Sequence, residues 1–581
     1  MTHSRDKRGP GLGPDLGLSD RPGRDDGGPV AALDAWARLL GADRVIVGDE
    51  VAQRYGRGTG PRTGRVPAAL LARTTEDVVA AVQVARAYRV PIYPISRGNN
   101  WGYGDATPVV DGCVVLDLSG MDRIVALDRE LGLVTIQPGV SQGDLRAHLD
   151  AHAPELMVPT TGAGPDASLV GNICERGYGI TPHQDHFMAT TAIEAVLPDG
   201  QLYCTPLTEL GAVTADRAHK WGLGPYLDGI FTQGGFGVVT EMTIALAPRG
   251  ERLASFYFSL RDDGGLEETV GAVQELLRAG GTALGGINLM NARRVLAMSV
   301  PYPTDRVERG EVMSPRLTAT LARQAGVGAW TGVGAIYGTP RITAAVRSEV
   351  RRLLRPHVDR LVFVDRARLR AAQRVVGALP ARTQERFAGR LAKVADSLEL
   401  MAGSPNRMAL PLAYWRAATT PGADVLHPAA DGCGLLWYSP LVPMRAGDVR
   451  RFTDLVHEVC THHAIEPLVT LTTLSDRCFD STVPVLYARE DPSESTRASA
   501  CHRELFRAGR QEGFVPYRVG VDDMDQVVGD SAFWSLTAAI KRAVDPADVI
   551  APGRYAPTDR VFRVPAPIAH RTSPPQRCPR S

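Results

Sequence analysis

The chain has 581 residues, of which 44% are hydrophobic and 22% are charged, and its formal net charge is +1. This length predicts several domains, and the near-neutral charge argues against nucleic acid or a membrane surface as a partner. No apolar run reaches the roughly 18 residues that would cross a bilayer. The eight cysteines are scattered without a C-x-x-C pair, which argues against a zinc ribbon or a disulfide framework.

Residues 1–30 are rich in Gly, Pro, Asp and Arg, and this composition predicts a disordered tail. The tail lacks the apolar segment of a secretory signal, so we expect a cytoplasmic protein.

Residues 31–248 alternate between helical and strand-like patterns. A helix is expected over residues 74–87, with Thr74 or Thr75 as its cap. A second helix is expected after Ser141, with Asp144 completing a capping box. The segments "VPIYPIS", "CVVLDLS", "RIVALD" and "LVTIQPG" have the pattern of strands, and Asp199-Gly200 is typical of a hairpin turn. The alternation, which is clearest over residues 65–150, predicts an α/β or an α+β domain.

The composition changes after Pro248. Arg-rich helical stretches alternate with strand-like segments such as "ERLASFYFSL" and "CGLLWYSPLV", so residues 249–512 are expected to form a second α+β domain. Residues 513–565 contain a helix that should end near Pro546. Residues 566–581 are Pro-rich and are expected to be loose.

The stretch "PISRGNNWGYGD", residues 94–105, combines glycines and asparagines with two aromatic residues. Its backbone N–H groups are suited to binding one anion together, as nests do. The stretch matches neither G-x-G-x-x-G nor G-x-x-x-x-G-K, and a structural turn explains it equally well. From these residues alone, both interpretations stay open.

The segment "HQDHF" places His183, Asp185 and His186 together. Two histidines and a carboxylate are possible metal ligands, but their spacing fits no zinc signature. We therefore expect no metal, and a metal-dependent hydrolase built on these residues is an alternative.

The order of motifs closely resembles the vanillyl-alcohol oxidase and 4-cresol dehydrogenase (hydroxylating) family of flavoproteins, which includes eugenol oxidase. The resemblance covers residues 65–250 and 430–560. Six ordered blocks carry it: "PISRGNNWGYGD", "GNICERGYGITPHQDHFM", "GPYLDGIFTQGGFGVVTEMTI", "LLWYSP", "VPYRVG" and "KRAVDPADVIAPGR".

The resemblance implies an α+β fold with a two-part FAD-binding domain of the vanillyl-alcohol oxidase (PCMH) type and a cap domain with a large antiparallel sheet. Residues 31–248 would form the FAD domain and residues 249–512 the cap, and residues 513–565 would return to the FAD domain. The implied FAD contacts are Ser96, Arg97, Gly98, Asn99, Asn100, Trp101, Gly102, Pro138, Thr161, Gly162, Ser168, Gly171, Asn172, Glu175, Gly177, Gly179, Gly237, Val238, Val239 and Arg554.

The family oxidises para-substituted phenols, and Tyr103, Tyr517 and Arg518 match its three residues that bind the phenolic oxygen. Ionising a phenol of pKa about 10 at pH 7 costs roughly 4 kcal/mol, which a fixed cation and two hydroxyl donors can offset. Hydride transfer from the benzylic carbon to flavin N5 would then give a p-quinone methide. Asp185 matches an acidic residue near N5, and Arg554 matches a basic residue near N1 and the C2 carbonyl.

The sequence departs from the family pattern where many members tether the flavin covalently. Leu435 stands where the histidine tether would align, and leucine cannot form that bond. We therefore expect non-covalent FAD. A histidine pair common in the cap is replaced by "CFDST" around Asp480, and Trp437 is expected to line the substrate pocket.

The expected partners are a small phenolic substrate and O2 as electron acceptor, with a cytochrome or another carrier as the alternative acceptor. Relatives are commonly dimers or larger, so we expect a homodimer or a larger assembly. One alternative function on the same fold is oxidation of a non-phenolic alcohol, and another is flavin binding without turnover.

Overall fold

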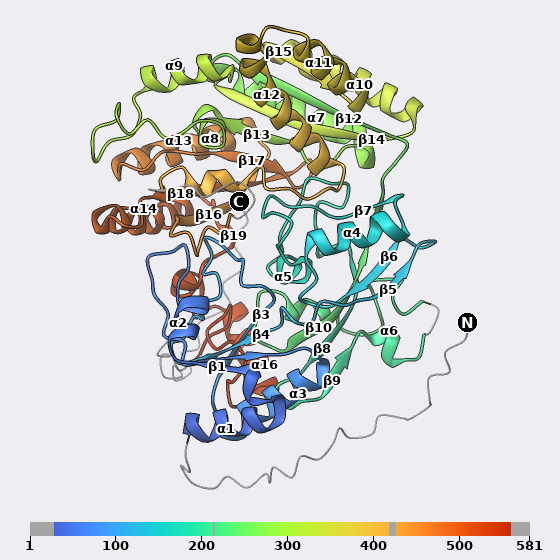
Figure 1. Cartoon of the computed structure of the whole chain (residues 1–581), viewed down its shortest axis with the longest axis vertical. Helices are drawn as coiled ribbons and strands as arrows, with labels where there is room; N and C mark the ends of the chain where they lie inside the picture. Colours follow the sequence, from blue (N-terminus) through green and yellow to red (C-terminus); the bar gives the residue numbers. More distant parts are fainter. Residues whose placement is uncertain (1–27, 213–214, 418–425, 559–581) are drawn as a thin grey trace, which may run out of the picture.

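The computed structural model describes residues 28–212, 215–417 and 426–558 (Figure 1). The tail predicted for residues 566–581 lies outside these ranges, as do residues 1–27 of the predicted N-terminal tail. Helix α1 (Gly28–Leu40) begins within the last three residues of that tail. No helix in the described ranges is long and apolar enough to cross a membrane.

The N-terminal part contains a four-stranded sheet in the order β1-β2-β4-β3, in which β4 pairs in parallel with both β2 and β3. Its strands are β1 (Val45–Val47), β2 (Ala68–Leu71), β3 (Ile92–Ile95) and β4 (Val114–Asp117). Helices α1, α2 (Asp49–Tyr55) and α3 (Thr75–Tyr88) accompany it. Thr74 and Asp77 form a capping box at the start of α3, which confirms the predicted N-terminus of this helix.

A five-stranded antiparallel sheet follows, in the order β5-β6-β10-β8-β9. Its strands are β5 (Ile124–Asp128), β6 (Leu133–Ile136), β8 (Thr190–Val196), β9 (Leu202–Cys204) and β10 (Val238–Ala245). The elements around it are α4 (Gln142–His152), β7 (Leu156–Met157), α5 (Leu169–Cys174), α6 (Pro206–Glu209) and β11 (Ala247–Pro248). Ser141 and Asp144 form the predicted capping box of α4, and β8 and β9 form the predicted hairpin.

The second half of the chain forms an eight-stranded antiparallel sheet in the order β15-β12-β14-β13-β17-β18-β16-β19. Its strands are β12 (Arg252–Leu260), β13 (Asn288–Asn291), β14 (Trp330–Gly338), β15 (Arg360–Val364), β16 (Gly434–Pro443), β17 (Thr470–Thr473), β18 (Cys478–Tyr487) and β19 (Pro516–Arg518). We call this the cap sheet; it lies in the upper half of Figure 1. The proposed boundary after residue 248 falls between β11 and β12.

The helices of this half are α7 (Leu266–Gly280), α8 (Ala292–Ala297), α9 (Pro315–Ala325), α10 (Pro340–Leu354), α11 (Arg366–Gly377), α12 (Ala381–Met401), α13 (Ala446–His462) and α14 (Pro492–Gln511). Two further helices follow β19: α15 (Met524–Val527) and α16 (Ala532–Val544).

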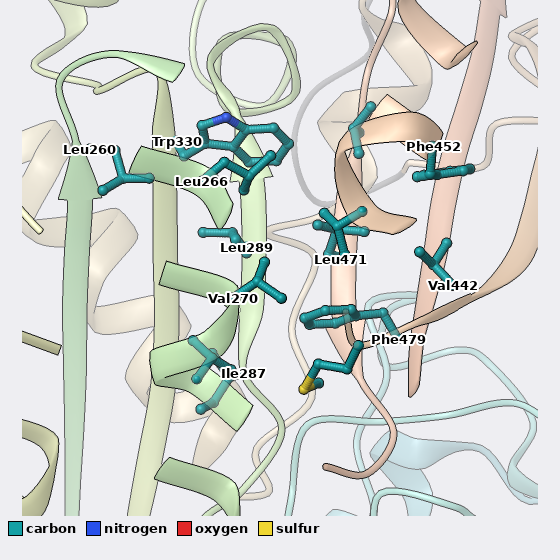
Figure 2. Close-up of a cluster of buried hydrophobic side chains, with 14 of the residues drawn as sticks. Leu260, Leu266, Val270, Ile287, Leu289, Trp330, Val442, Phe452, Leu471 and Phe479 are labelled. Carbon is teal, nitrogen blue, oxygen red and sulfur yellow. The ribbon is translucent and has the colours of Figure 1, made fainter. Parts of the chain in front are cut away.

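The two faces of the cap sheet differ in chemistry because side chains alternate along each strand. One face packs its apolar side chains against α7 and α13, where Val270, Leu289, Leu471 and Phe452 share one core (Figure 2). The neighbours of Leu471, which are Thr470 and Thr472, point to the opposite face and line a cavity. The alternation thus gives the sheet one apolar face and one face that lines the cavity.

The C-terminal segment packs beside the first sheet. The backbone of Ile92 in β3 accepts a hydrogen bond from Ala551 N and donates one to Val549 O, both 2.8 Å long. The buried ammonium of Lys541 donates to Asp545 and to the carbonyls of Gly235 and Ile550. These bonds bring Arg554 to the cavity.

Candidate active site

A cavity of about 1150 Å³ lies between the N-terminal sheets and the cap sheet. It exceeds the usual range of small-molecule pockets, roughly 300–1,000 Å³. Its walls come from the glycine-rich segments 93–103 and 160–180, from the cap sheet, and from residues 517–518 and 551–554. A space of this size, with one glycine-rich wall, can hold a dinucleotide and a small substrate together.

The glycine-rich stretch 94–105 turns sharply at three points. Gly98, Gly102 and Gly104 have φ values of 69°, 80° and 117°, a region that residues with a Cβ rarely adopt. A Cβ on Gly102 would lie 2.2 Å from the Trp437 ring. The glycines therefore let this loop turn and press closely against the cap.

The implied FAD contacts gather around the cavity. All of them line it except Gly102, which packs against Trp437 instead. Backbone from glycine-rich segments far apart in the sequence forms this wall, so the arrangement fits an extended ligand with a diphosphate. The buried Nη1 of Arg554, which also lines the cavity, has no hydrogen-bond partner in the protein. This free donor fits the flavin carbonyl that the resemblance assigns to it.

Glu175 lies between Arg518 and Arg554. Its Oε1 is 2.6 Å from Arg554 Nη2, and its Oε2 is 3.4 Å from Arg518 Nε. Sequence reasoning treated Glu175 only as a cofactor contact, whereas here one carboxylate serves two guanidinium groups. The three side chains together carry one excess positive charge, which favours a bound anion.

Tyr103, Tyr517 and Arg518 meet in the cavity, although more than 400 residues separate the first from the others. The Arg518 guanidinium lies 4.1 Å from the centre of the Tyr103 ring, and it donates to Asn100 Oδ1. The Tyr103 hydroxyl shares a 2.5 Å hydrogen bond with Ser439 Oγ. Burial raises the pKa of Tyr103 to about 12 and raises that of Tyr517 as well. Both phenols therefore stay protonated near neutral pH and can act as donors.

Asp480 is a buried acid of the same cavity, on β18. Its Oδ1 has no hydrogen-bond partner. Burial raises its pKa to about 7, although the charge of Arg518 partly opposes the shift. Sequence reasoning noted Asp480 only as a replacement for histidine, and the alternation along β18 was the signal that could have placed it in the cavity.

Asp185 does not line the cavity, unlike the other three residues implied in catalysis. Its carboxylate accepts a 3.0 Å hydrogen bond from Met188 N and so caps its own turn. His186 bonds Asn172 through Nδ1. Among the described residues, potential metal ligands gather instead at His462, His463 and Glu504, away from this segment.

Trp437 and Leu435 both line the cavity from β16. The Trp437 indole donates a 3.0 Å hydrogen bond to Trp101 O, and this bond ties the cap to the glycine-rich loop. Leu435 is 3% exposed and presents only hydrocarbon at the expected tether position.

Arg294 is a cavity residue that sequence reasoning missed. It belongs to α8, directly after β13, and is 8% exposed. Its Nε donates a 3.0 Å hydrogen bond to Thr470 Oγ1, and its buried Nη1 has no partner. Nothing in the local sequence separates Arg294 from its neighbour Arg293.

Comparisons with known proteins agree with this architecture. Residues 66–205 match the family model described as FAD binding domain. The chain is 36% identical over 529 residues to 1'-carboxy-chondrochloren decarboxylase of Chondromyces crocatus, covering 90% of this chain and 96% of that protein. It is 29% identical over 532 residues to the 4-cresol dehydrogenase [hydroxylating] flavoprotein subunit of Pseudomonas putida, covering 90% and 94%.

The fold is similar to that of p-cresol methylhydroxylase in its substrate-bound crystal structure. The TM-score is 0.80 at 27% identity, and the match covers 90% of this chain and 96% of the other. The predicted α+β fold, with a PCMH-type FAD-binding domain and a large antiparallel sheet, is confirmed. The chain belongs to the vanillyl-alcohol oxidase and 4-cresol dehydrogenase family of FAD-dependent oxidoreductases.

Proposed function

We propose that this protein oxidises or hydroxylates a para-substituted phenol at its benzylic carbon. The observation that carries the proposal is the meeting of Tyr103, Tyr517 and Arg518 in one buried part of the cavity. A cation and two protonated hydroxyl groups in a water-poor site favour a phenolate over a phenol.

The charge balance of the site supports phenolate binding. Arg518 and Arg554 share Glu175, so one positive charge remains for the ligand while Asp480 is neutral. The Ser439 hydroxyl holds the Tyr103 side chain in place. Arg518 is itself fixed by Asn100, so little reorganisation is needed when the phenolate forms.

FAD, when bound, supplies the hydride acceptor. Loss of the phenolic proton and of a benzylic hydride converts the substrate to a p-quinone methide. Water can then add its oxygen to the benzylic carbon and return a proton to the ring oxygen, which gives the alcohol. If the benzylic carbon already carries a hydroxyl group, loss of that proton gives the aldehyde or ketone instead. Tyr103, Tyr517 and Arg518 would stabilise the negative ring oxygen of the phenolate.

We extend the proposal to non-covalent FAD, because Leu435 is the residue at the tether position. O2 is the proposed electron acceptor, with a cytochrome or another carrier as the alternative. A homodimer or larger assembly in the cytoplasm completes the proposal. The domain limits given above are part of it, except that β19, within residues 513–565, pairs with β16 of the cap sheet.

The variant Arg518→Met tests the phenolate scheme. We expect kcat/KM for 4-alkylphenols and 4-hydroxybenzyl alcohols to fall by at least about a hundredfold, because a charged partner of the developing anion is lost. Arg507→Met is the control, since Arg507 is exposed and pairs with Glu504 on α14. Unchanged phenol oxidation in Arg518→Met would overturn the phenolate scheme. If a phenol added to the wild-type protein without oxygen fails to bleach the flavin, the protein binds flavin without turnover.

A second candidate function is oxidation coupled to loss of CO2. The unpaired guanidinium of Arg294 favours it, because that group indicates an acidic substrate. The Chondromyces crocatus relative is named a decarboxylase. In such a reaction, the quinone methide would accept the electron pair of a breaking C–CO2 bond on the adjacent carbon, giving a vinylphenol and CO2. Product masses from a 4-hydroxyphenyl acid distinguish this outcome from hydroxylation.

A further inference from the structure

Arg294 is a buried cation without an anion. Its Nη1 is buried without a hydrogen-bond partner, and its side chain lines the cavity. Among the described residues, no carboxylate forms an ion pair with it. Burial lowers its pKa to about 10, so the guanidinium stays charged near neutral pH. A charge held in this way is costly unless something in the functional state pairs with it.

The adjacent arginine shows the ordinary structural arrangement. Arg293 forms a buried ion pair with Glu466 and donates to Met313 O. Glu466 also accepts hydrogen bonds from Met313 N and from the Tyr302 hydroxyl. Two consecutive arginines of α8 therefore differ in one respect: the first has its carboxylate within the protein, and the second faces the cavity without one.

The position of Arg294 separates it from the proposed cofactor wall. Its hydrogen-bond partner Thr470 lies in the cap sheet and pairs with Thr482, while Thr472 pairs with Asp480. Thr470 and Asp480 are thus diagonal neighbours on one face, about 7–8 Å apart. Asp480 lies beside the phenol-binding residues, and Thr470 contacts Arg294. The phenol-binding residues and Arg294 are therefore separated by a short distance along the cap sheet.

We propose that Arg294 binds the carboxylate of a phenolic acid whose ring hydroxyl lies between Tyr103, Tyr517 and Arg518. The proposal rests on the proposed function for the phenol end and adds the substrate class. The side chain between ring and carboxylate would have two or three carbon atoms, because Thr470 and Asp480 are diagonal neighbours in the sheet. The carboxylate would supply the counterion that Arg294 lacks.

The test compares 4-hydroxycinnamate with its methyl ester. Neither compound has an sp³ benzylic hydrogen, so calorimetry measures binding to the FAD-loaded protein without turnover. We expect the acid to bind about ten- to a hundredfold more tightly than the ester, as for hydrogen bonds to a charged group. In Arg294→Met this preference should fall to about one, whereas Arg294→Lys should keep part of it.

Arg293→Lys is the matched control, and it should keep the preference for the acid. Arg294→Met should retain the melting temperature and FAD content of the wild type, since the substitution leaves no unpaired carboxylate behind. Equal affinity of acid and ester in the wild type, or an unchanged preference in Arg294→Met, would overturn the proposal. Loss of FAD from Arg294→Met would assign the guanidinium to the cofactor and would also overturn it.

Failure of this inference differs from failure of the proposed function. If 4-alkylphenols are oxidised in an Arg518-dependent way while acid and ester bind equally, the carboxylate site is wrong and phenol oxidation stands. If cinnamate, which lacks the hydroxyl, binds as tightly as 4-hydroxycinnamate through Arg294, the phenolate scheme fails and the carboxylate site stands.

Discussion

The protonation of one side chain sets the charge of the part of the cavity where Tyr103, Tyr517 and Arg518 meet. Asp480, with its pKa raised by burial to about 7, is neutral in mildly acidic solution and anionic in mildly basic solution. Arg518 and Arg554 share Glu175, so the cluster carries one positive charge in the first case and none in the second. A phenolate should therefore bind better when Asp480 is protonated.

This coupling predicts a pH dependence that Asp480→Asn removes. Relative to that of Asp480→Asn, the wild-type affinity for a non-oxidisable phenol such as 4-hydroxyacetophenone should fall about fivefold between pH 7 and pH 8, because the protonated fraction of a carboxyl of pKa about 7 falls from about one half to about one tenth. Ionisation of the phenol itself affects both proteins equally and cancels in this ratio. The amide has no proton to lose, so the variant should bind more tightly at pH 8. Calorimetric titration at several pH values measures both. Asp396→Asn, which changes an exposed acid of the cavity wall, is the control, and equal slopes in wild type and Asp480→Asn would contradict the coupling.

Sequence motifs could identify the residues that match family positions, because each motif contains the residue that the resemblance implies in catalysis. Tyr103, Tyr517 and Arg518 all reach the cavity. Asp185 does not, because its carboxylate bonds the turn of its own loop. Arg293 pairs with Glu466, a residue more than 170 positions away, whereas Arg294 forms no ion pair among the described residues. Such long-range pairing leaves no trace in the local sequence.

At the scale of elements, residues 94–105 join the glycine-rich wall of the cavity to β16. Gly102 combines a positive φ with a position directly against Trp437. Gly112 has a similar φ of 87° but open space where a Cβ would lie. Gly112→Ala should therefore lower the free energy of unfolding by only about 1–2 kcal/mol, the cost of the backbone conformation alone. Gly102→Ala should cost roughly 1–3 kcal/mol more through overpacking and should weaken FAD binding, as measured by denaturant unfolding and flavin fluorescence. Equal effects of the two substitutions would contradict the close packing.

Elements defined by local signals were predicted well. The capping boxes of α3 and α4 and the hairpin β8–β9 depend on residues a few positions apart. The order of strands in the cap sheet was not predictable, because β13 and β17 pair across some 180 residues. That pairing puts Thr470 beside α8, so the position of Arg294 follows from a contact that no local pattern specifies.

On the scale of the whole molecule, the cavity exists only when both halves of the chain are folded together. Its glycine-rich wall comes from residues 93–239, its opposite wall from the cap sheet, and Arg554 from the segment that follows α16. Backbone hydrogen bonds of Ile92 with Val549 and Ala551 hold that last segment to β3, and Lys541 donates to the carbonyl of Gly235. A ligand that touches all these walls binds the folded protein only, and so it stabilises the whole fold.

Non-covalent FAD should therefore make the melting temperature depend on free FAD. Acid precipitation should leave the yellow colour in the supernatant, because Leu435 offers no bond to the flavin. For protein stripped of FAD, a hundredfold excess of FAD over Kd adds about 2.7 kcal/mol, which is roughly 2–3 °C at about 2 cal/mol/K per residue. Arg554→Met should need more FAD for the same shift, since the unpaired Nη1 donor is lost.

A yellow pellet and a melting temperature that does not change with FAD would instead indicate a tether. Cys174→Ser would then test the one cysteine among the described residues that line the cavity.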